Sequence, residues 1–358
     1  MRLRHVLLAS VILTAAPALA EAPKFTPWGV DLTAADAAVK PGDDFWAYVN
    51  GGWDKRTQIA SDRTFVGIDS VLNDQIDKDV RSIIEAKAAD PQGSGQLGQQ
   101  IGDLYASWMD TATIEKLGTA PIKPYLAKID AISTREQLAD AFGQVGMPSP
   151  FGTFIAASND DPTRYAVYLV QSGLGMPGRD YYLLPGAKYD AYRAAYLAYV
   201  TRTQELAGIP DAAAKAKRIV DLETAIARLH WTPEQSRDAK ATNNPMKLAE
   251  LQDYAPEVDW KGYYKALGLD GSQTFIVAQK TAIRDETKLF AATPVSTWKE
   301  WLAYQFVSDS SPYLPATFDQ ARFDFYSKTL RDVPVQRDRW KRGVDLVNGA
   351  LGEAVGQF

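Results

Sequence analysis

Histidine, the side chain on which most hydrolytic sites depend, is scarce in this sequence. Its 358 residues include only His5 and His230, and there is no cysteine. A zinc hydrolase of the H-E-x-x-H type needs two imidazoles four residues apart on one helix face, so that both reach one metal ion. The sequence has no such pair, and the count alone excludes a three-histidine site. The lack of cysteine excludes disulfides, thiolate metal sites and cysteine nucleophiles.

His230 follows Ile226 by one helical turn on an apolar face, next to Trp231. A histidine in such a position is usually a hydrogen-bonded core or interface residue, so we predict packing rather than metal binding or catalysis. The serine-nucleophile elbow G-x-S-x-G is absent, and a triad would have to use His230 as its base. The sequence therefore predicts no catalytic residue and no metal ligand.

A match to the dinucleotide-binding pattern G-x-G-x-x-G occurs at Gly173, Gly175 and Gly178. That pattern binds a pyrophosphate only where the glycines open a helix after a strand. Pro177 and the following residues 179–183 do not read as such a helix. We therefore predict a turn-rich loop and not a nucleotide site.

Carboxylates are plentiful, with 44 acidic residues against 39 basic ones and a net charge of −5. This balance argues against a nucleic-acid partner, which normally requires a basic patch. Adjacent acids such as Asp43-Asp44 and Asp160-Asp161 are expected on solvated faces and in turns. A glycosidase-like carboxylate pair stays open as an alternative, because its members need only meet in space.

The first twenty residues have the features of a secretory signal peptide. Arg2 and Arg4 precede an apolar run over residues 6–20, which ends in the small-x-small sequence Ala18-Leu19-Ala20. The run is short for a bilayer span, although an uncleaved anchor is an alternative. We expect export to the periplasm or the cell exterior, with no stable membrane span.

The remaining chain is predicted to be mainly α-helical. Apolar residues recur at helical spacing over 72–84, 97–108, 138–145, 192–206 and 219–231. Ser133 and Glu136 suggest a capping box at the start of the third of these segments. Residues 151–156 and 165–170 are rich in β-formers and flank a turn signal at 159–162, which predicts one β-hairpin. The fold class is therefore mainly α with a small β-hairpin.

Several segments, taken in order, resemble the N-terminal region of the neprilysin-type zinc metallopeptidases, the M13 family. They are Pro41-Gly42-Asp43-Asp44-Phe45-Trp46 with its continuation to Trp53, residues 172–183, Leu222-Glu223-Thr224 through Met246, residues 293–299 and residues 339–356. Each motif is weak alone, but five in the correct order are a strong signal, and their order and spacing run over nearly the whole chain after the predicted signal peptide. The absence of cysteine fits a bacterial member, because animal members carry disulfides.

The resemblance implies a peptidase of two lobes that face a central chamber. In that family the zinc ligands and the general base lie in the C-terminal lobe, and residues 21–358 correspond to the multi-helix lid lobe. We expect residues 21–60 to pack on the catalytic lobe, which this chain lacks. Zinc is the cofactor of the family, and no cofactor is expected in this chain.

The resemblance also implies one substrate contact. In the family a lid-lobe arginine, closely followed by an aspartate, binds the terminal carboxylate of the substrate. Arg63 lies where that arginine should fall, although Asp69 does not match the spacing of the aspartate. Arg63 is therefore the predicted substrate-binding residue, with an ordinary surface or helix-capping arginine as the alternative.

These observations lead to two hypotheses. The first is the noncatalytic N-terminal portion of an M13-type peptidase, inactive alone, whose partners are short peptides and a separately encoded catalytic chain. The second is a periplasmic peptide-binding or scaffold protein derived from the lid lobe. The amphipathic segment 340–355 runs to the end of the sequence, which suggests a truncated or split gene product. We then expect exposed apolar surface on residues 45–53 and on this last helix.

Overall fold

The computed structural model describes residues 31–90 and 93–358, so the predicted signal peptide, residues 1–20, lies outside the described residues. The chain divides into two compact units between Ile59 and Ala60. Within the described ranges, none of the helices combines the length and the apolar character that crossing a membrane requires. That residues 21–60 pack on a catalytic lobe remains a prediction.

The first unit contains the 3-10 helix η1 (Leu32–Ala34) and helix α1 (Phe45–Arg56). Asp44 caps α1 because its side chain accepts a hydrogen bond from the backbone N–H of Ala47 at 2.8 Å. At the other end of α1, Arg56 pairs with Asp31 at 2.9 Å. The ion pair thus joins the end of α1 to the residue that precedes η1 within the same unit.

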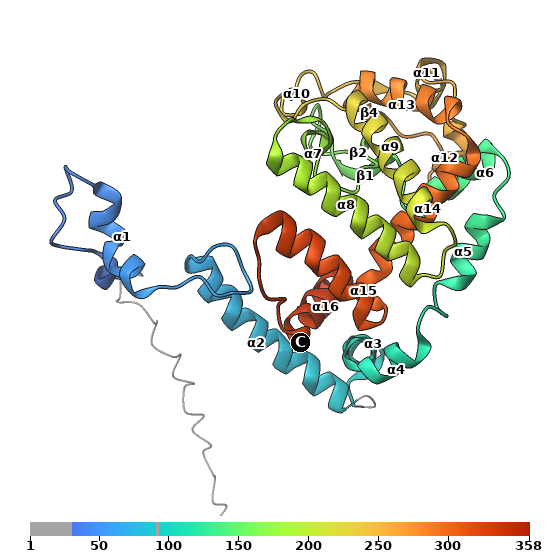
Figure 1. Cartoon of the computed structure of the whole chain (residues 1–358). Coiled ribbons are helices and arrows are strands. Elements are labelled where there is room, and N and C mark those ends of the chain that lie inside the picture. Colours follow the sequence, from blue (N-terminus) through green and yellow to red (C-terminus); the bar gives the residue numbers. More distant parts are fainter. Residues whose placement is uncertain (1–30, 91–92) are drawn as a thin grey trace, which may run out of the picture. The chain divides into compact units, whose positions relative to one another are not determined.

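The second unit is built mainly of helices (Figure 1). Its helices are α2 (Ile68–Ala89), α3 (Gly95–Met109), α4 (Thr111–Leu117), α5 (Lys123–Asp130), α6 (Arg135–Phe142), α7 (Arg179–Leu183), α8 (Ala187–Leu206), α9 (Ala212–Leu229), α10 (Pro233–Ser236), α11 (Leu248–Tyr254), α12 (Trp260–Ala266), α13 (Lys280–Ala292), α14 (Val295–Ser310), the 3-10 helix η2 (Ser311–Tyr313), α15 (Ala316–Phe323), the π-helix η3 (Asp324–Thr329) and α16 (Arg339–Val355).

Four of the predicted helical segments are confirmed by α2, α3, α8 and α9. The start of α6 differs from the prediction, because Thr134 and Gln137 form the capping box in place of Ser133 and Glu136. The helix also ends earlier than predicted: it stops at Phe142, and Val145 lies beyond it with 83% of its surface exposed.

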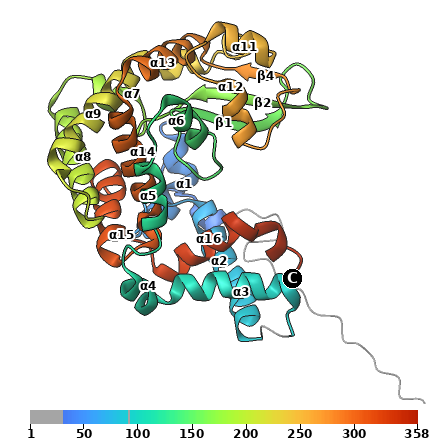
Figure 2. The same ribbon diagram turned by 90° about the vertical axis from the view of Figure 1, so that its right-hand side faces the viewer.

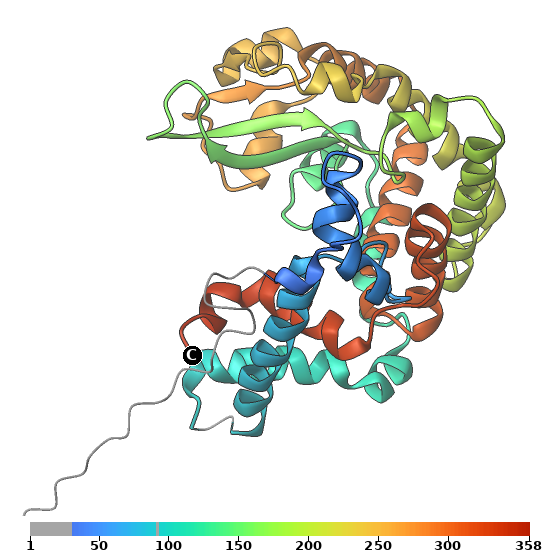
Figure 3. The ribbon, with the colours of Figure 1, turned by 90° about the vertical axis from the view of Figure 1, so that its left-hand side faces the viewer.

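The predicted hairpin is confirmed, but it belongs to a larger sheet. Strands β1 (Phe151–Ala157) and β2 (Tyr165–Gln171) pair antiparallel. They form one side of a four-stranded sheet whose strand order is β1-β2-β4-β3 (Figure 3). Strand β4 (Phe275–Val277) runs parallel to β2, and β3 (Pro245–Met246) runs antiparallel to β4. Sequence reasoning missed β3 and β4 because two or three residues are too short for a periodic signal.

Buried aromatic side chains fill the main core between the sheet and the helices. The largest wholly buried ones are Trp260, Trp298, Trp301, Tyr196, Tyr263, Tyr264, Tyr304, Phe142, Phe151, Phe275 and Phe290. Many contact each other edge to face, as Phe142 does with Trp301 at a centroid distance of 5.9 Å. This core holds α8, α9, α14 and the sheet in fixed positions.

A second, smaller apolar cluster joins α2, α3 and α16, which lie side by side (Figure 2). Its members include Ile84, Ile101, Val344, Val347 and Val355. The expectation of an exposed apolar stripe on the last helix is therefore wrong, because α2 and α3 cover that stripe.

The corresponding expectation for residues 45–53 holds for the start of α1. Phe45, Trp46 and Val49 are all exposed there, with Phe45 at 68%.

Candidate functional site

Arg63, the predicted substrate-binding residue, lies in the loop that precedes α2. The loop is fixed at both ends: the backbone N–H of Val335 donates to the carbonyl of Ser61 at 3.2 Å, and the N–H of Gly67 donates to the Ser70 hydroxyl at 3.2 Å. The Arg63 side chain is 21% exposed. It is therefore held in place and still reachable from solvent.

Two aspartates bind the Arg63 guanidinium. Nη2 and Nη1 contact the two carboxylate oxygens of Asp74 at 3.0 and 3.3 Å, and Nε contacts Asp62 at 3.1 Å. The hydrogen bonds from Arg63 hold the pKa of Asp74 below its usual range. Lys341 adds a second cation, 3.7 Å from Asp62 and 3.8 Å from Asp74. The aspartates that contact Arg63 are thus Asp62 and Asp74, the latter on the second turn of α2, whereas Asp69 does not contact it.

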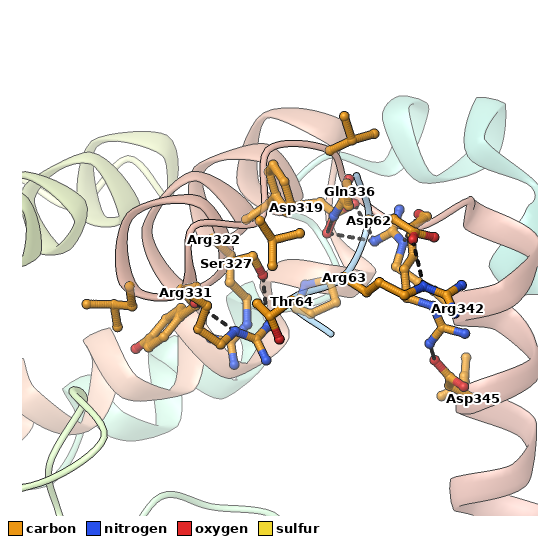
Figure 4. A pocket seen from close by; sticks show the side chains of 18 of the residues that line it. Asp62, Arg63, Thr64, Asp319, Arg322, Ser327, Arg331, Gln336, Arg342 and Asp345 are labelled. Atoms are coloured by element: carbon orange, nitrogen blue, oxygen red, sulfur yellow. Dashed lines mark hydrogen bonds and ion pairs between the residues drawn. The ribbon is translucent and has the colours of Figure 1, made fainter. Parts of the chain in front are cut away.

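Arg63 lines a cavity of about 1060 Å³ in the second unit. The other walls come from α3, α7, η2, α15, η3, the segment before α16, and α16 itself. Figure 4 shows the labelled side chains that line it. Five arginines and three aspartates line it, together with Trp108, Tyr313 and Tyr326. A concave space of this size with apolar walls and convergent charges is typical of a ligand site.

Ion pairs join the helices around this cavity. Arg342 binds both oxygens of Asp319 at 2.8 and 3.0 Å, which links α16 to α15. Arg337 bridges Asp77 on α2 at 3.0 Å and Asp345 on α16 at 2.6 Å. These ion pairs thus hold α2, α15 and α16 together around the cavity without a ligand. Sequence reasoning missed these arginines, because their partners lie up to 260 residues away in the chain.

His230 is buried, as its apolar neighbours predict, and it does not line this cavity. Its Nε2 lies 2.8 Å from Oε1 of the wholly buried Glu286 and 3.1 Å from the carbonyl oxygen of Ser172. Burial lowers the pKa of His230 to about 4 and raises that of Glu286 well above its usual value. Both groups therefore favour the neutral form, and the pair joins α9 to α13.

Glu223 is a second buried acid that sequence reasoning did not single out. Its Oε2 accepts hydrogen bonds from the hydroxyls of Tyr182 and Tyr196 at 2.6 and 2.7 Å. Its Oε1 accepts from Nε1 of Trp301 at 3.2 Å and from Nε2 of Gln305 at 2.7 Å. Burial raises its pKa to about 7, against the opposing effect of these donors. The carboxylate thus joins α7, α8, α9 and α14 at the centre of the core.

The glycine pattern at residues 173–178 packs against that cluster. A Cβ on Gly175 would lie 1.9 Å from the Tyr196 hydroxyl, and Gly173 has a positive φ of 91°. Contrary to the sequence prediction, residues 179–183 do form a helix, α7, but it has only five residues. The backbone at residue 175 lies so close to Tyr196 that only glycine fits there, so packing explains this glycine and no nucleotide site is needed.

The described residues do not fit a catalytic zinc ion. Such an ion takes three protein ligands and a water molecule. His230 with Glu286 supplies two donors, both enclosed in the core, and in the described ranges no group of three or more histidine, aspartate or glutamate side chains could hold a metal ion.

Comparison with known proteins gives a consistent result. Residues 41–358 match the sequence profile of peptidase family M13. Endothelin-converting enzyme 1 of Rattus norvegicus is 25% identical over 341 residues, which are 91% of this chain and 44% of that protein. The chain thus spans about half the length of the curated relatives it matches.

Solved structures agree. Zinc metalloprotease Zmp1 of Mycobacterium tuberculosis, in complex with an inhibitor, is 34% identical with a TM-score of 0.86, over 92% of this chain and 51% of that one. PepO from Lactobacillus rhamnosis, 19% identical over 89% of this chain and 51% of that one, shares the fold with a TM-score of 0.74. The mainly helical architecture with a small sheet is thus that of the N-terminal region of the neprilysin-type zinc peptidases, and the chain belongs to peptidase family M13.

Proposed function

We propose that this chain is the noncatalytic, substrate-receiving portion of a zinc peptidase that acts on short peptides. The cavity that contains Arg63 is the observation that carries this proposal. A guanidinium binds a carboxylate through two parallel N–H···O contacts, and Arg63 already makes that contact with Asp74. We propose that the C-terminal carboxylate of a peptide takes the place of Asp74.

The chain alone is then expected to bind peptides without cleaving them. Its sequence has no H-E-x-x-H segment, and His230, the one histidine among the described residues, is buried 2.8 Å from Glu286. The hydrolytic step would require zinc ligands from a second lobe or chain. We also propose export to the periplasm or the cell exterior, on the basis of the signal-like residues 1–20.

Calorimetric titration of the full chain with short peptides tests this proposal. Peptides with a free C-terminal carboxylate should bind more tightly than their C-terminal amides. The variant R63Q should abolish that difference, while R164Q, which removes an exposed arginine outside the cavity, should keep it. R63K retains the charge but not the bidentate contact, and it should lose part of the difference. Circular dichroism of each variant verifies folding.

Two results would overturn the proposal. One is equal affinity for free and amidated peptides in the unmodified chain. The other is peptide cleavage by the purified chain that a metal chelator removes.

A further inference from the structure

The arginines that line the cavity differ in what they already bind. Arg63, Arg337 and Arg342 each contact at least one carboxylate at 3.1 Å or less. Their charge is thus compensated within the protein. Two further arginines, Arg322 and Arg331, are not compensated in this way, and they lie together at one end of the cavity (Figure 4).

Arg331 donates only to neutral oxygens in the described chain. Its Nε contacts the carbonyl of Tyr326 at 3.2 Å, and its Nη2 contacts the Ser327 hydroxyl at 3.0 Å. No carboxylate of residues 31–90 or 93–358 lies within ion-pair distance of it. These two contacts occupy Nε and Nη2, so N–H donors on Nη1 stay available to a ligand.

Arg322 adds a second positive charge at the same end of the cavity (Figure 4). Its Nη1 donates to the carbonyl of Ser308 at 2.9 Å, and its guanidinium lies over the Tyr326 ring, 4.7 Å from the centroid. Its carboxylate neighbour, Asp309, is at 4.0 Å, which is too long for a hydrogen bond. Tyr326 therefore has one arginine on its ring and the other on its carbonyl.

The backbone around Arg331 is fixed by local contacts. The π-helix η3 ends at Thr329, and such helices occur often at functional sites. Asp332 takes a positive φ of 55°, which turns the chain so that the N–H of Val333 returns to the carbonyl of Ser327 at 3.1 Å. Arg331 is thus presented from a defined turn rather than from a loose loop.

We propose that Arg331, supported by Arg322, is a second carboxylate contact in this cavity, and that the cavity favours short peptides with an acidic side chain. The inference rests on the proposed function, because it assumes that peptides enter here through Arg63. Two separate cationic positions would then recognise two carboxylates of one ligand. The apolar walls at Trp108 and Tyr313 would contact the residues between them.

The test uses the full chain and N-acetylated tetrapeptides in calorimetric titrations. One set carries glutamate at each of the three positions before the C-terminal residue, and a matched set carries glutamine there. Each peptide is made as free acid and as amide. We expect the best glutamate peptide to bind about fivefold more tightly than its glutamine counterpart, as for a partly exposed charge pair.

Three variants assign that preference. R331Q should abolish it, R331K should retain part of it, and R164Q should leave it unchanged. Arg331 is exposed, so its substitution should not unfold the chain. Equal binding of glutamate and glutamine peptides, or a preference that survives in R331Q, would overturn the inference.

The two proposals fail in different ways. If free acids bind better than amides but glutamate has no effect, only the inference on Arg331 is wrong. If glutamate matters but amidation does not, the role of Arg63 is wrong. If no peptide binds at all, both are wrong.

Discussion

The guanidinium of Arg63 and the carboxylate of Asp74 face each other through two parallel contacts, at 3.0 and 3.3 Å. The arginine expected to bind a substrate carboxylate therefore already holds one from its own chain. Asp74 holds the guanidinium in one orientation, and it competes with any ligand carboxylate that needs the same two N–H groups.

The first prediction concerns this competition. D74N should tighten the binding of peptides with a free C-terminal carboxylate by about three- to tenfold, because a neutral amide competes less well for Arg63. Asp74 is 41% exposed, so the loss of its ion pair should lower the free energy of unfolding by no more than about 1 kcal/mol. Calorimetric titration with free and amidated peptides measures the first effect, and urea unfolding the second.

D79N is the matched control. Asp79 lies on the same helix, contacts Gln75 and no arginine of the described residues, and does not line the cavity. It should leave peptide affinity unchanged, because an exposed charge at that distance is screened by salt. Weaker or unchanged binding by D74N would show that Asp74 does not compete with the ligand.

The second prediction concerns the pH dependence of stability that Glu223 confers. Its pKa in the folded chain, about 7, is above the ordinary value of 4.5. Between these values the folded chain holds a proton that the unfolded chain releases, so the free energy of unfolding falls as pH rises from about 4.5 to about 7. The fall attributable to Glu223 is on the order of 3 kcal/mol at most.

E223Q tests this, because glutamine cannot ionise. At pH 5 the variant should be less stable by about 1–2 kcal/mol, since its amide nitrogen faces hydrogen-bond donors. At pH 8 the deficit should shrink or reverse, because only the original chain buries a charge. Urea unfolding of both proteins at the two pH values gives the comparison. A deficit that grows with pH would contradict the raised pKa of Glu223.

The third prediction separates two glycines of the pattern at 173–178. G175A should lower the free energy of unfolding by about 1–3 kcal/mol, because its Cβ would overlap the Tyr196 hydroxyl. G178A should have little effect, since nothing lies within 4 Å of its Cβ and its φ of 178° is extended backbone. Thermal unfolding of both variants checks the pair. An equal loss of stability in both variants would mean that Gly175 is not required for packing against Tyr196.

The sequence predicted those helices whose apolar residues recur at regular spacing over many residues. The stripes of α2, α3, α8 and α9 are long enough for periodicity to reveal them, whereas β3 and β4 are not. Glu223 falls on the stripe of Ile219 and Ile226, and an acid on an apolar helix face is a signal of a buried, hydrogen-bonded carboxylate. That signal was available in the sequence.

The candidate site was less predictable. The likeness to the M13 family pointed to Arg63, but no local pattern shows that Asp74 pairs with it or that Arg331 forms no ion pair within residues 31–90 and 93–358. Such pairings depend on which elements pack together, as for Arg337 and Asp77. Only the tertiary arrangement of the described residues distinguishes an arginine that pairs with a carboxylate from one that does not.

The last prediction concerns how α16 packs on α3. Gly343 is buried at their contact, where a Cβ would lie 2.7 Å from Cδ1 of Trp108 and 2.9 Å from Tyr105. G343A should therefore lower the free energy of unfolding by about 1–3 kcal/mol through overpacking. Gly349 lies on the same helix and is exposed, and a Cβ added there would have nothing within 4 Å. G349A should instead raise the free energy of unfolding by about 0.5–1 kcal/mol, because alanine has a higher helix propensity than glycine. Urea unfolding should thus show a lower free energy of unfolding for G343A and a higher one for G349A, although both replace glycine by alanine on the same helix. Stabilisation by both substitutions would mean that α16 does not pack on α3 as described.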